Sequence, residues 1–148
     1  MLMNRFLIWF GETFASRKKL IINDPCGAGP YLTRYYMLGH RTSRWAVMLH
    51  RFHRSDMDRD LHDHPWAYWS LILTGGYWEV TPDGAFHWYR PGRLLRRNAT
   101  WRHRVALYSP AGPVWTLVLR FKYERTWGFH TDNGWVSFRD YDYEAGCE

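Results

Sequence analysis

The stretch RDLHDHPWAYWSLILTGGYWEV, residues 59–80, decides how this chain is expected to fold. It places His62 and His64 on either side of one aspartate, directly before a β-prone run at 67–73. In an extended segment, residues two apart point to the same side of the sheet, so both imidazoles are aimed at one place. The TGG that follows predicts a hairpin turn, because glycine adopts a positive φ at little cost. The stretch therefore predicts a β-sheet that carries a pair of convergent histidines.

Similar β-prone runs, separated by turn residues, continue on both sides of this stretch. They cover residues 31–38, 44–52, 77–81, 85–89, 93–97, 100–107, 114–123 and 135–141. About ten short strands with turns at close intervals are typical of a β-sandwich or a β-barrel. The sequence therefore predicts an all-β domain.

Apolar and polar residues alternate along the run 114–123. One face carries Trp115, Leu117, Leu119 and Phe121, and the other carries Thr116, Arg120 and Lys122. An antiparallel sheet with one buried and one solvated face shows this alternation. We therefore expect the tryptophan face to be buried and the threonine face to be exposed to solvent.

The first 30 residues follow a different pattern. Leu7, Phe10 and Phe14 recur at helical spacing, which predicts a short amphipathic helix. Its apolar run FLIWF is shorter than the apolar region of a secretory signal peptide, which has about 7–15 residues. No apolar run in the chain approaches the length of a membrane span, about 18 residues or more. The predicted organisation is a helix and linker at 1–30, closing one end of a β-barrel domain at 31–148.

The composition limits the class of protein and its partners. The 148 residues, 46% of them hydrophobic and 19% aromatic, indicate one domain with a substantial core and exclude disorder. The net charge of +6 is scattered without a run of like charges, which argues against nucleic acid as a partner. A small molecule is the expected partner, and the positive charge would favour an anionic one. Cys26 and Cys147 form no CxxC pair, which fits a reducing, cytoplasmic setting.

A third histidine extends the pattern. His103, in NATWRHRVAL, lies one strand pair downstream, where a jelly roll would bring it to face His62 and His64. On these spacings the chain resembles the cupin family. Cupins carry a first motif with two histidines one residue apart, then a glutamate and a glycine, and a second motif with a glycine followed by a distal histidine. His62, His64 and Gly75 fit the first motif, and Gly92 and His103 fit the second.

The chain also departs from the cupin motifs. Tyr68 occupies the place of the motif glutamate. Elsewhere Asp56, Asn98, Thr100 and Leu107 stand where cupins carry Gly, Pro, Gly and Asn. The two motifs span residues 56–107, and the chain is also similar to small uncharacterised cupin-like proteins, some of them from bacteriophages.

The resemblance implies a fold and a site. The fold is a double-stranded β-helix, the jelly-roll barrel of cupins, with a short N-terminal helix. His62, His64 and His103 would bind a divalent transition metal, with Fe(II) preferred and Zn, Mn or Ni as alternatives. Tyr68 would point inward beside the metal as a hydrogen-bond donor or an acid. Asp60 is a candidate for restoring the missing carboxylate.

The implied function is that of a small metal-dependent enzyme, dioxygenase-like, acting on a small molecule. Arg51 and Arg96 are the candidates for binding a carboxylate or phosphate of the substrate. A metal-dependent isomerase, in which the ion polarises a carbonyl, is one alternative. A non-catalytic module, either a metal-free sensor or a phage-associated scaffold, is another. We also expect a homodimer, formed through the aromatic edge RYYML at 34–38.

The remaining histidines are expected to play no part in metal binding. His50, His53, His87 and His130 are interpreted as surface, core or loop residues. Asp63, between the two proposed ligands, is expected to point outward and to make a salt bridge or a turn contact.

Overall fold

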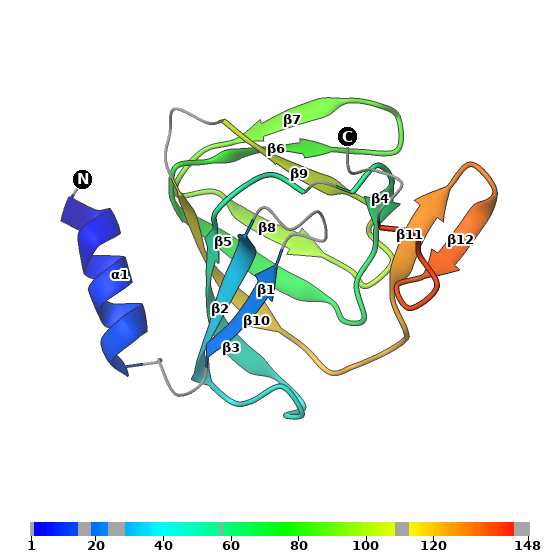
Figure 1. The fold of residues 1–148 in the computed structure, drawn as a ribbon. Helices are drawn as coiled ribbons and strands as arrows, with labels where there is room; N and C mark the ends of the chain where they lie inside the picture. Colours follow the sequence, from blue (N-terminus) through cyan, green and yellow to red (C-terminus); the bar gives the residue numbers. More distant parts are fainter. Residues whose placement is uncertain (1, 15–18, 24–28, 57, 109–112, 144–148) are drawn as a thin grey trace.

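The computed structural model describes residues 2–14, 19–23, 29–56, 58–108 and 113–143. Its elements are α1 (Leu2–Phe14), β1 (Lys19–Asn23), β2 (Pro30–Leu38), β3 (Ala46–Phe52), β4 (Leu61–His62), β5 (Tyr68–Thr74), β6 (Tyr77–Val80), β7 (Phe86–Tyr89), β8 (Leu94–Arg97), β9 (Arg104–Leu107), β10 (Val114–Arg120), β11 (Gly128–Thr131) and β12 (Gly134–Ser137). The fold is all-β apart from the short N-terminal helix, as the sequence predicts (Figure 1).

The strands form the two walls of a barrel. One wall is a six-stranded sheet in the order β1-β2-β3-β10-β5-β8. The other consists of two three-stranded sheets, β7-β6-β9 and β12-β11-β4. An antiparallel bridge between His62 and His103 joins these two three-stranded sheets, with backbone hydrogen bonds of 3.0 Å in both directions. Strands distant in sequence therefore lie side by side, as the jelly roll requires (Figure 1).

The central strand β10 shows which face of the six-stranded sheet is inside. Thr116 and Arg120 are 1% and 3% exposed, whereas Leu117 on the opposite face is 37% exposed. The expectation that the threonine face is solvated is therefore wrong. Trp115 is buried because α1 covers the outer face of the sheet at this residue, whereas the outer face of β10 is exposed at Leu117.

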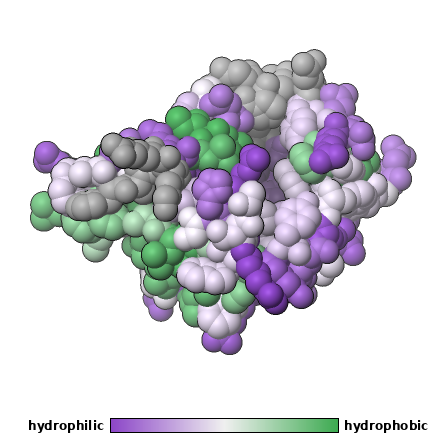
Figure 2. All heavy atoms as spheres, turned by 90° about the horizontal axis from the view of Figure 1, so that it is seen from below, coloured by the Kyte–Doolittle hydropathy of each residue, from purple (hydrophilic) through white to green (hydrophobic). Residues whose placement is uncertain are grey.

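Helix α1 packs against the outside of the barrel rather than closing its end. Leu7 contacts a cluster that includes Tyr35 and Trp115, and Asn4 Oδ1 accepts a hydrogen bond of 2.5 Å from Trp115 Nε1. Tyr35 donates a further hydrogen bond to Glu12 at 2.8 Å. The other side of the helix leaves Leu2, Met3, Phe6 and Trp9 exposed. Hydrophobic residues accordingly gather on the α1 side of the molecule (Figure 2).

The TGG segment is a corner between the two walls and not a hairpin. Strand β5 pairs with β10 and β8, whereas β6 pairs with β7 and β9. Gly75 and Gly76 make the crossing with φ angles of 79° and 94°. At Gly76 a Cβ would lie 2.8 Å from the Trp88 ring and from the Tyr89 carbonyl oxygen. The corner therefore needs glycine for conformation and for space.

Strand β1 falls within the segment 1–30 that the sequence assigns to a helix and linker, and it pairs with β2. Residues 34–38 consequently lie inside the sheet, so the expectation that they form a free edge is wrong; β1 and β8 are the edge strands. Strand β11 also forms where the sequence predicts only a connection. The division of the chain at residue 30 and the homodimer stay predictions.

Among the described residues, no helix combines the length and the apolar character that a membrane crossing requires. Cys26 and Cys147 lie outside the described residues, and the cytoplasmic location stays a prediction.

Candidate metal centre

Backbone hydrogen bonds hold the three candidate ligands before their side chains are considered. His62 and His103 are bridge partners and exchange hydrogen bonds of 3.0 Å. The N–H of His64 donates to the carbonyl of Ala99 at 3.0 Å. His62 and His64 lie two residues apart in an extended segment, so they share a side, as the sequence predicts. The pairing with His103 is the long-range contact that brings in the third imidazole.

The three imidazoles converge on one point. The Nε2 atoms of His64 and His103 are 2.8 Å apart. The potential ligand atoms of His62, His64 and His103 all lie within 4.8 Å of one another. Because a metal–imidazole bond is about 2.0–2.1 Å long, two nitrogens on one ion can be at most about 4.2 Å apart. Side-chain shifts of less than about 1 Å would therefore let all three bind a single ion.

Glu79 sets the orientation of His103. The Nδ1–H of His103 donates to Glu79 Oε1 at 2.7 Å, which leaves Nε2 as the free acceptor facing His64. Glu79 also accepts hydrogen bonds from Arg97 at 2.7 Å and from Trp101 at 3.2 Å. Burial alone would raise the pKa of Glu79, but the hydrogen bonds from His103 and Arg97 lower it to about 2. The carboxylate is therefore ionised and held from three sides.

Sequence reasoning missed Glu79, although a signal for it exists. Tyr77 and Glu79 lie two apart on β6, and both are buried, at 4% and 1% exposed. Strand alternation places a carboxylate on the same inward face as an aromatic core residue. Asp60, the expected replacement carboxylate, instead accepts hydrogen bonds from Arg59 and from the Tyr141 hydroxyl at 2.9 Å. Glu79 contacts His103 through Nδ1, on the side of the ring away from His64.

Tyr68, at the position of the cupin glutamate, lies beside two of the histidines. Its hydroxyl is 3.4 Å from His103 Nε2, and its ring centroid is 4.8 Å from that of His64. Burial raises the pKa of Tyr68 well above its ordinary value, so the hydroxyl stays protonated and able to donate.

The other two imidazoles are neutral. Burial lowers the pKa of His62 to about 4, although Asp56 opposes the shift, and burial also lowers the pKa of His64 well below 6.5. His62 Nδ1 is buried without a hydrogen-bond partner in the described part of the chain, and the nearest Asp56 oxygen is 3.9 Å away. Neutral imidazole is the form that binds metals.

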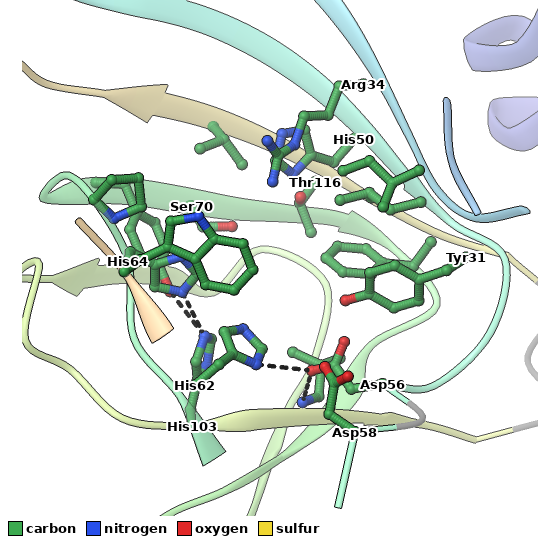
Figure 3. A pocket seen from close by; sticks show the side chains of 18 of the residues that line it. Tyr31, Arg34, His50, Asp56, Asp58, His62, His64, Ser70, His103 and Thr116 are labelled. Carbon is green, nitrogen blue, oxygen red and sulfur yellow. Dashed lines mark hydrogen bonds and ion pairs between the residues drawn. The ribbon is translucent and has the colours of Figure 1, made fainter. Parts of the chain in front are cut away.

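The histidines form part of the wall of a cavity of about 410 Å³. Aromatic residues make up much of the rest: Tyr31, Phe52, Trp66, Tyr77, Trp127 and Phe129. The size and the mainly apolar wall, with a few polar groups, are those of a site for a small molecule. Figure 3 shows the histidines at one side of this space.

Neither predicted substrate-binding arginine lines the cavity. Arg51 lies on the outer face of β3, with its guanidinium carbon 5.6 Å from the Trp115 ring centroid. Arg96 stacks on the outward side chain of Trp69 at 4.8 Å. The arginine that does line the cavity is Arg34 on β2, and His50 on β3 lies beside it. Sequence reasoning overlooked Arg34, although it alternates inward with buried neighbours along β2.

Asp63 makes the expected salt bridge, but in a fully buried position away from the cavity. It accepts hydrogen bonds from Arg125 at 2.6 Å, from the Gly128 N–H at 2.9 Å, from His130 at 3.0 Å and from Trp135 at 3.1 Å. All four partners belong to β11, β12 or the segment before them. Asp63 thereby fixes the β11–β12 hairpin to the segment that carries His62 and His64.

The sequence matches no protein-family model and no curated protein sequence. The structure, in contrast, is similar to solved proteins. A cupin-2 domain protein from Rhodospirillum rubrum superposes with a TM-score of 0.58 at 13% identity, covering 78% of this chain and 76% of that one. A cupin-superfamily sugar phosphate isomerase from Silicibacter pomeroyi superposes with a TM-score of 0.52 at 15% sequence identity, covering 72% of this chain and 74% of that one. FeII HppE superposes with a TM-score of 0.56 at 10% identity, covering 71% of this chain and 57% of that one.

Proposed function

We propose that this chain, which has the cupin fold, is a metal-dependent enzyme that acts on a small molecule inside the barrel. One observation carries the proposal. His62, His64 and His103 place ligand atoms within 4.8 Å of one another on the wall of a cavity of about 410 Å³. His103 is also held by the buried carboxylate of Glu79, as metal-binding histidines usually are.

The three imidazoles would hold one divalent transition ion and leave its other coordination positions open. An all-nitrogen donor set suits Fe, Zn, Ni and Cu, so the ligands alone do not select the metal. We favour Fe(II), which would supply oxygen-dependent oxidation of a bound small molecule. The similarity in fold to FeII HppE supports this choice.

Residues of the chain would perform the remaining tasks. The Tyr68 hydroxyl, 3.4 Å from His103 Nε2, would donate a hydrogen bond to a substrate atom near the ion. Glu79 would keep His103 in the tautomer that presents Nε2. Trp66, Trp127 and Phe129 would exclude water from the substrate, since they line the same cavity.

A metal-dependent isomerase is the second candidate. In that reaction the ion would polarise a substrate carbonyl, and Tyr68 would hydrogen-bond the oxygen where charge develops. The structural similarity to a sugar phosphate isomerase supports this alternative. A metal-free binding module is the remaining reading.

Elemental analysis of untagged protein tests the proposal. Wild type should contain about one equivalent of a transition metal after reconstitution, and His64→Ala and His103→Ala should each lose it. His87→Ala, a variant of an exposed histidine on β7, should retain it and serves as the control. Absence of metal from wild type, with no rise in thermal stability on adding Fe(II) or Zn(II), would leave the binding-module reading.

The two enzymatic candidates separate on the Fe(II)-loaded protein. Nitric oxide occupies positions that oxygen would use, so an open iron site should give a high-spin EPR signal that His103→Ala abolishes. Both candidates leave positions open for substrate, so this signal establishes an open iron site. Oxygen uptake then separates them: conversion of a candidate substrate with consumption of oxygen favours the dioxygenase, and conversion in anaerobic solution favours the isomerase.

A further inference from the structure

A row of polar residues crosses the inner face of the six-stranded sheet, on the wall opposite the histidine bridge. Arg34 on β2 is the register partner of His50 on β3, and His50 is the partner of Thr116 on β10. All three line the cavity. In Figure 3 they lie together, across the cavity from His62 and His103.

The rows on either side are mainly apolar. They consist of Leu32, Phe52 and Val114 on one side and Tyr36, Met48 and Val118 on the other. His50 is 7% exposed and Thr116 is 1% exposed. The polar row is therefore not part of a solvated surface, because it is set within a buried wall.

Each member of the row has a buried polar atom without a partner. Arg34 Nε, His50 Nε2 and Thr116 Oγ1 are inaccessible to solvent and accept or donate no hydrogen bond within the described parts of the chain. Buried polar atoms in native proteins are nearly always satisfied, so three unsatisfied atoms in one row indicate a ligand or ordered water.

The charge of Arg34 favours a ligand over ordered water. No carboxylate in the described residues lies within ion-pair distance of its guanidinium, which has the hydroxyls of Tyr36 and Tyr31 and the ring of Trp66 as neighbours. Asp56, the nearest cavity carboxylate to the histidines, is engaged by the Val105 N–H at 2.6 Å. Water can satisfy a hydroxyl or an imidazole, but a desolvated guanidinium needs a negative charge to offset its cost.

We infer that Arg34, His50 and Thr116 form a binding subsite for the oxyanion end of the ligand, a carboxylate or a phosphate. A guanidinium, an imidazole N–H and a hydroxyl can all donate, and an oxyanion accepts several such hydrogen bonds at once. This inference rests on the proposed function, because it assumes that the small molecule binds in this cavity. It adds the class of ligand: a small molecule with an anionic group at one end and its reacting part at the histidine wall.

Anion binding to the metal-free protein tests the inference. Protein stripped of metal and dialysed into chelator-free Tris chloride is titrated with inorganic phosphate and, separately, with malonate, by calorimetry. At least one anion should bind saturably, and the tighter one identifies the group. Arg34→Gln should weaken that binding about tenfold or more, and Thr116→Val a few-fold. Arg96→Gln, a change on the outer face, should leave it unchanged.

A second readout comes from stability without any added anion. Because Arg34 is then a buried charge without a counter-ion, Arg34→Gln should unfold at a temperature no lower than wild type, and phosphate or malonate should raise the melting temperature of wild type only. Wild type that binds neither anion, or an Arg34→Gln variant that binds as wild type does, overturns the subsite. Should Arg34→Gln not fold, an unchanged Thr116→Val affinity overturns it equally.

The subsite and the proposed metal site fail separately. Anion affinity is measured without metal, and metal content is measured without phosphate or malonate. Arg34-dependent anion binding in a protein that takes up no metal would retain the subsite and remove the metalloenzyme. Metal uptake with no anion binding would retain the metal site and remove the subsite.

Discussion

The Nδ1 atom of His103 donates a hydrogen bond of 2.7 Å to Oε1 of Glu79, and this contact determines which nitrogen of His103 faces the other histidines. Glu79 is in turn held by Arg97 and Trp101. A chain of charged and polar contacts therefore runs from half-buried Arg97 to the cavity wall. It ties the geometry of the candidate metal centre to strands β6 and β8.

Replacing Glu79 with glutamine should weaken metal binding without removing a ligand. The amide can still accept from His103, but it loses its charge and no longer compensates Arg97. We expect affinity for Zn(II) to fall about 10–100-fold and the free energy of unfolding to fall by about 1–3 kcal/mol. Competition with a chromophoric chelator and urea unfolding measure the two. Glu124→Gln, a variant of an exposed carboxylate, should change neither; equal affinity in Glu79→Gln would show that the contact has no such role.

Asp63→Ala should release the β11–β12 hairpin. The substitution leaves Arg125, the Gly128 N–H and Trp135 without their shared acceptor. Breaking a buried charge network of this kind costs about 3–5 kcal/mol, and the partial exposure of Arg125 places the expected loss near the lower value. Urea unfolding measures the loss, and hydrogen exchange should accelerate first at Phe129 and its neighbours. Asp132→Ala, in the exposed turn of the same hairpin, is the matched control and should alter stability little.

Gly76→Ala should destabilise the protein more than Gly92→Ala does. The difference between the two variants measures the cost of the close contacts that a Cβ would make at Gly76. Both glycines have positive φ, 94° and 86°, so both substitutions incur backbone strain of about 1 kcal/mol or more. A Cβ at Gly92 meets nothing within 4 Å, whereas one at Gly76 lies 2.8 Å from Trp88 and from the Tyr89 carbonyl oxygen. We expect Gly76→Ala to cost at least about 1–2 kcal/mol more in thermal unfolding. Similar melting temperatures for the two variants would contradict the tight corner.

The stability of the metal-free protein should fall as the pH decreases from 6.5. Burial lowers the pKa of His50 well below its ordinary value of 6.5. The unfolded chain therefore takes up a proton near pH 6.5 while the folded protein does not, so acidification favours unfolding. The contribution is complete above pH 6.5 and declines below it by up to about 1.4 kcal/mol per pH unit.

Urea unfolding between pH 7.5 and pH 5 measures this dependence. His50→Gln should make it shallower, because glutamine does not titrate. His87→Gln, at an exposed position on β7, should leave the slope as in wild type. Buried His62 and His64, whose pKa values are also lowered, should keep part of the slope in this variant. A slope identical in His50→Gln and wild type would show that the His50 ring does not contribute.

The sequence allowed the all-β class, the short helix and the grouping of His62, His64 and His103 to be predicted, because each depends on spacing. Alternation within a segment and the distance between two motifs are local properties of the chain. The partners of these residues are not local. Glu79 accepts a hydrogen bond from His103, which is 24 residues away in the sequence, and Asp63 accepts hydrogen bonds from residues more than 60 positions away. Their roles became visible only once the strands were paired.

The choice of the inner face could not be read from polarity. In β10 the inward row contains Thr116 and Arg120, whereas the outward row contains Trp115 and Leu117. Alternation shows which residues share a face, but helix α1 covers the outer face and a cavity hollows the inner one. The usual assignment of polar residues to solvent is then reversed. The neighbouring strands show the same arrangement: Arg34 on β2 lines the cavity, whereas Arg51 on β3 lies on the outer face.

The pair of hydrogen bonds between His62 and His103 has a dynamic consequence. Within the described residues it is the one ladder pair between β12-β11-β4 and β7-β6-β9, so the wall behind the cavity has a seam. Outside this pair, the backbone hydrogen bonds Asp56–Val105 and His64–Ala99 hold the seam, whereas continuous ladders hold the six-stranded wall. Local opening should therefore begin at the seam, and the amides of His62 and His103 should exchange faster than those of β3 and β10. A molecule that enters the cavity along the seam would contact the candidate metal ligands first.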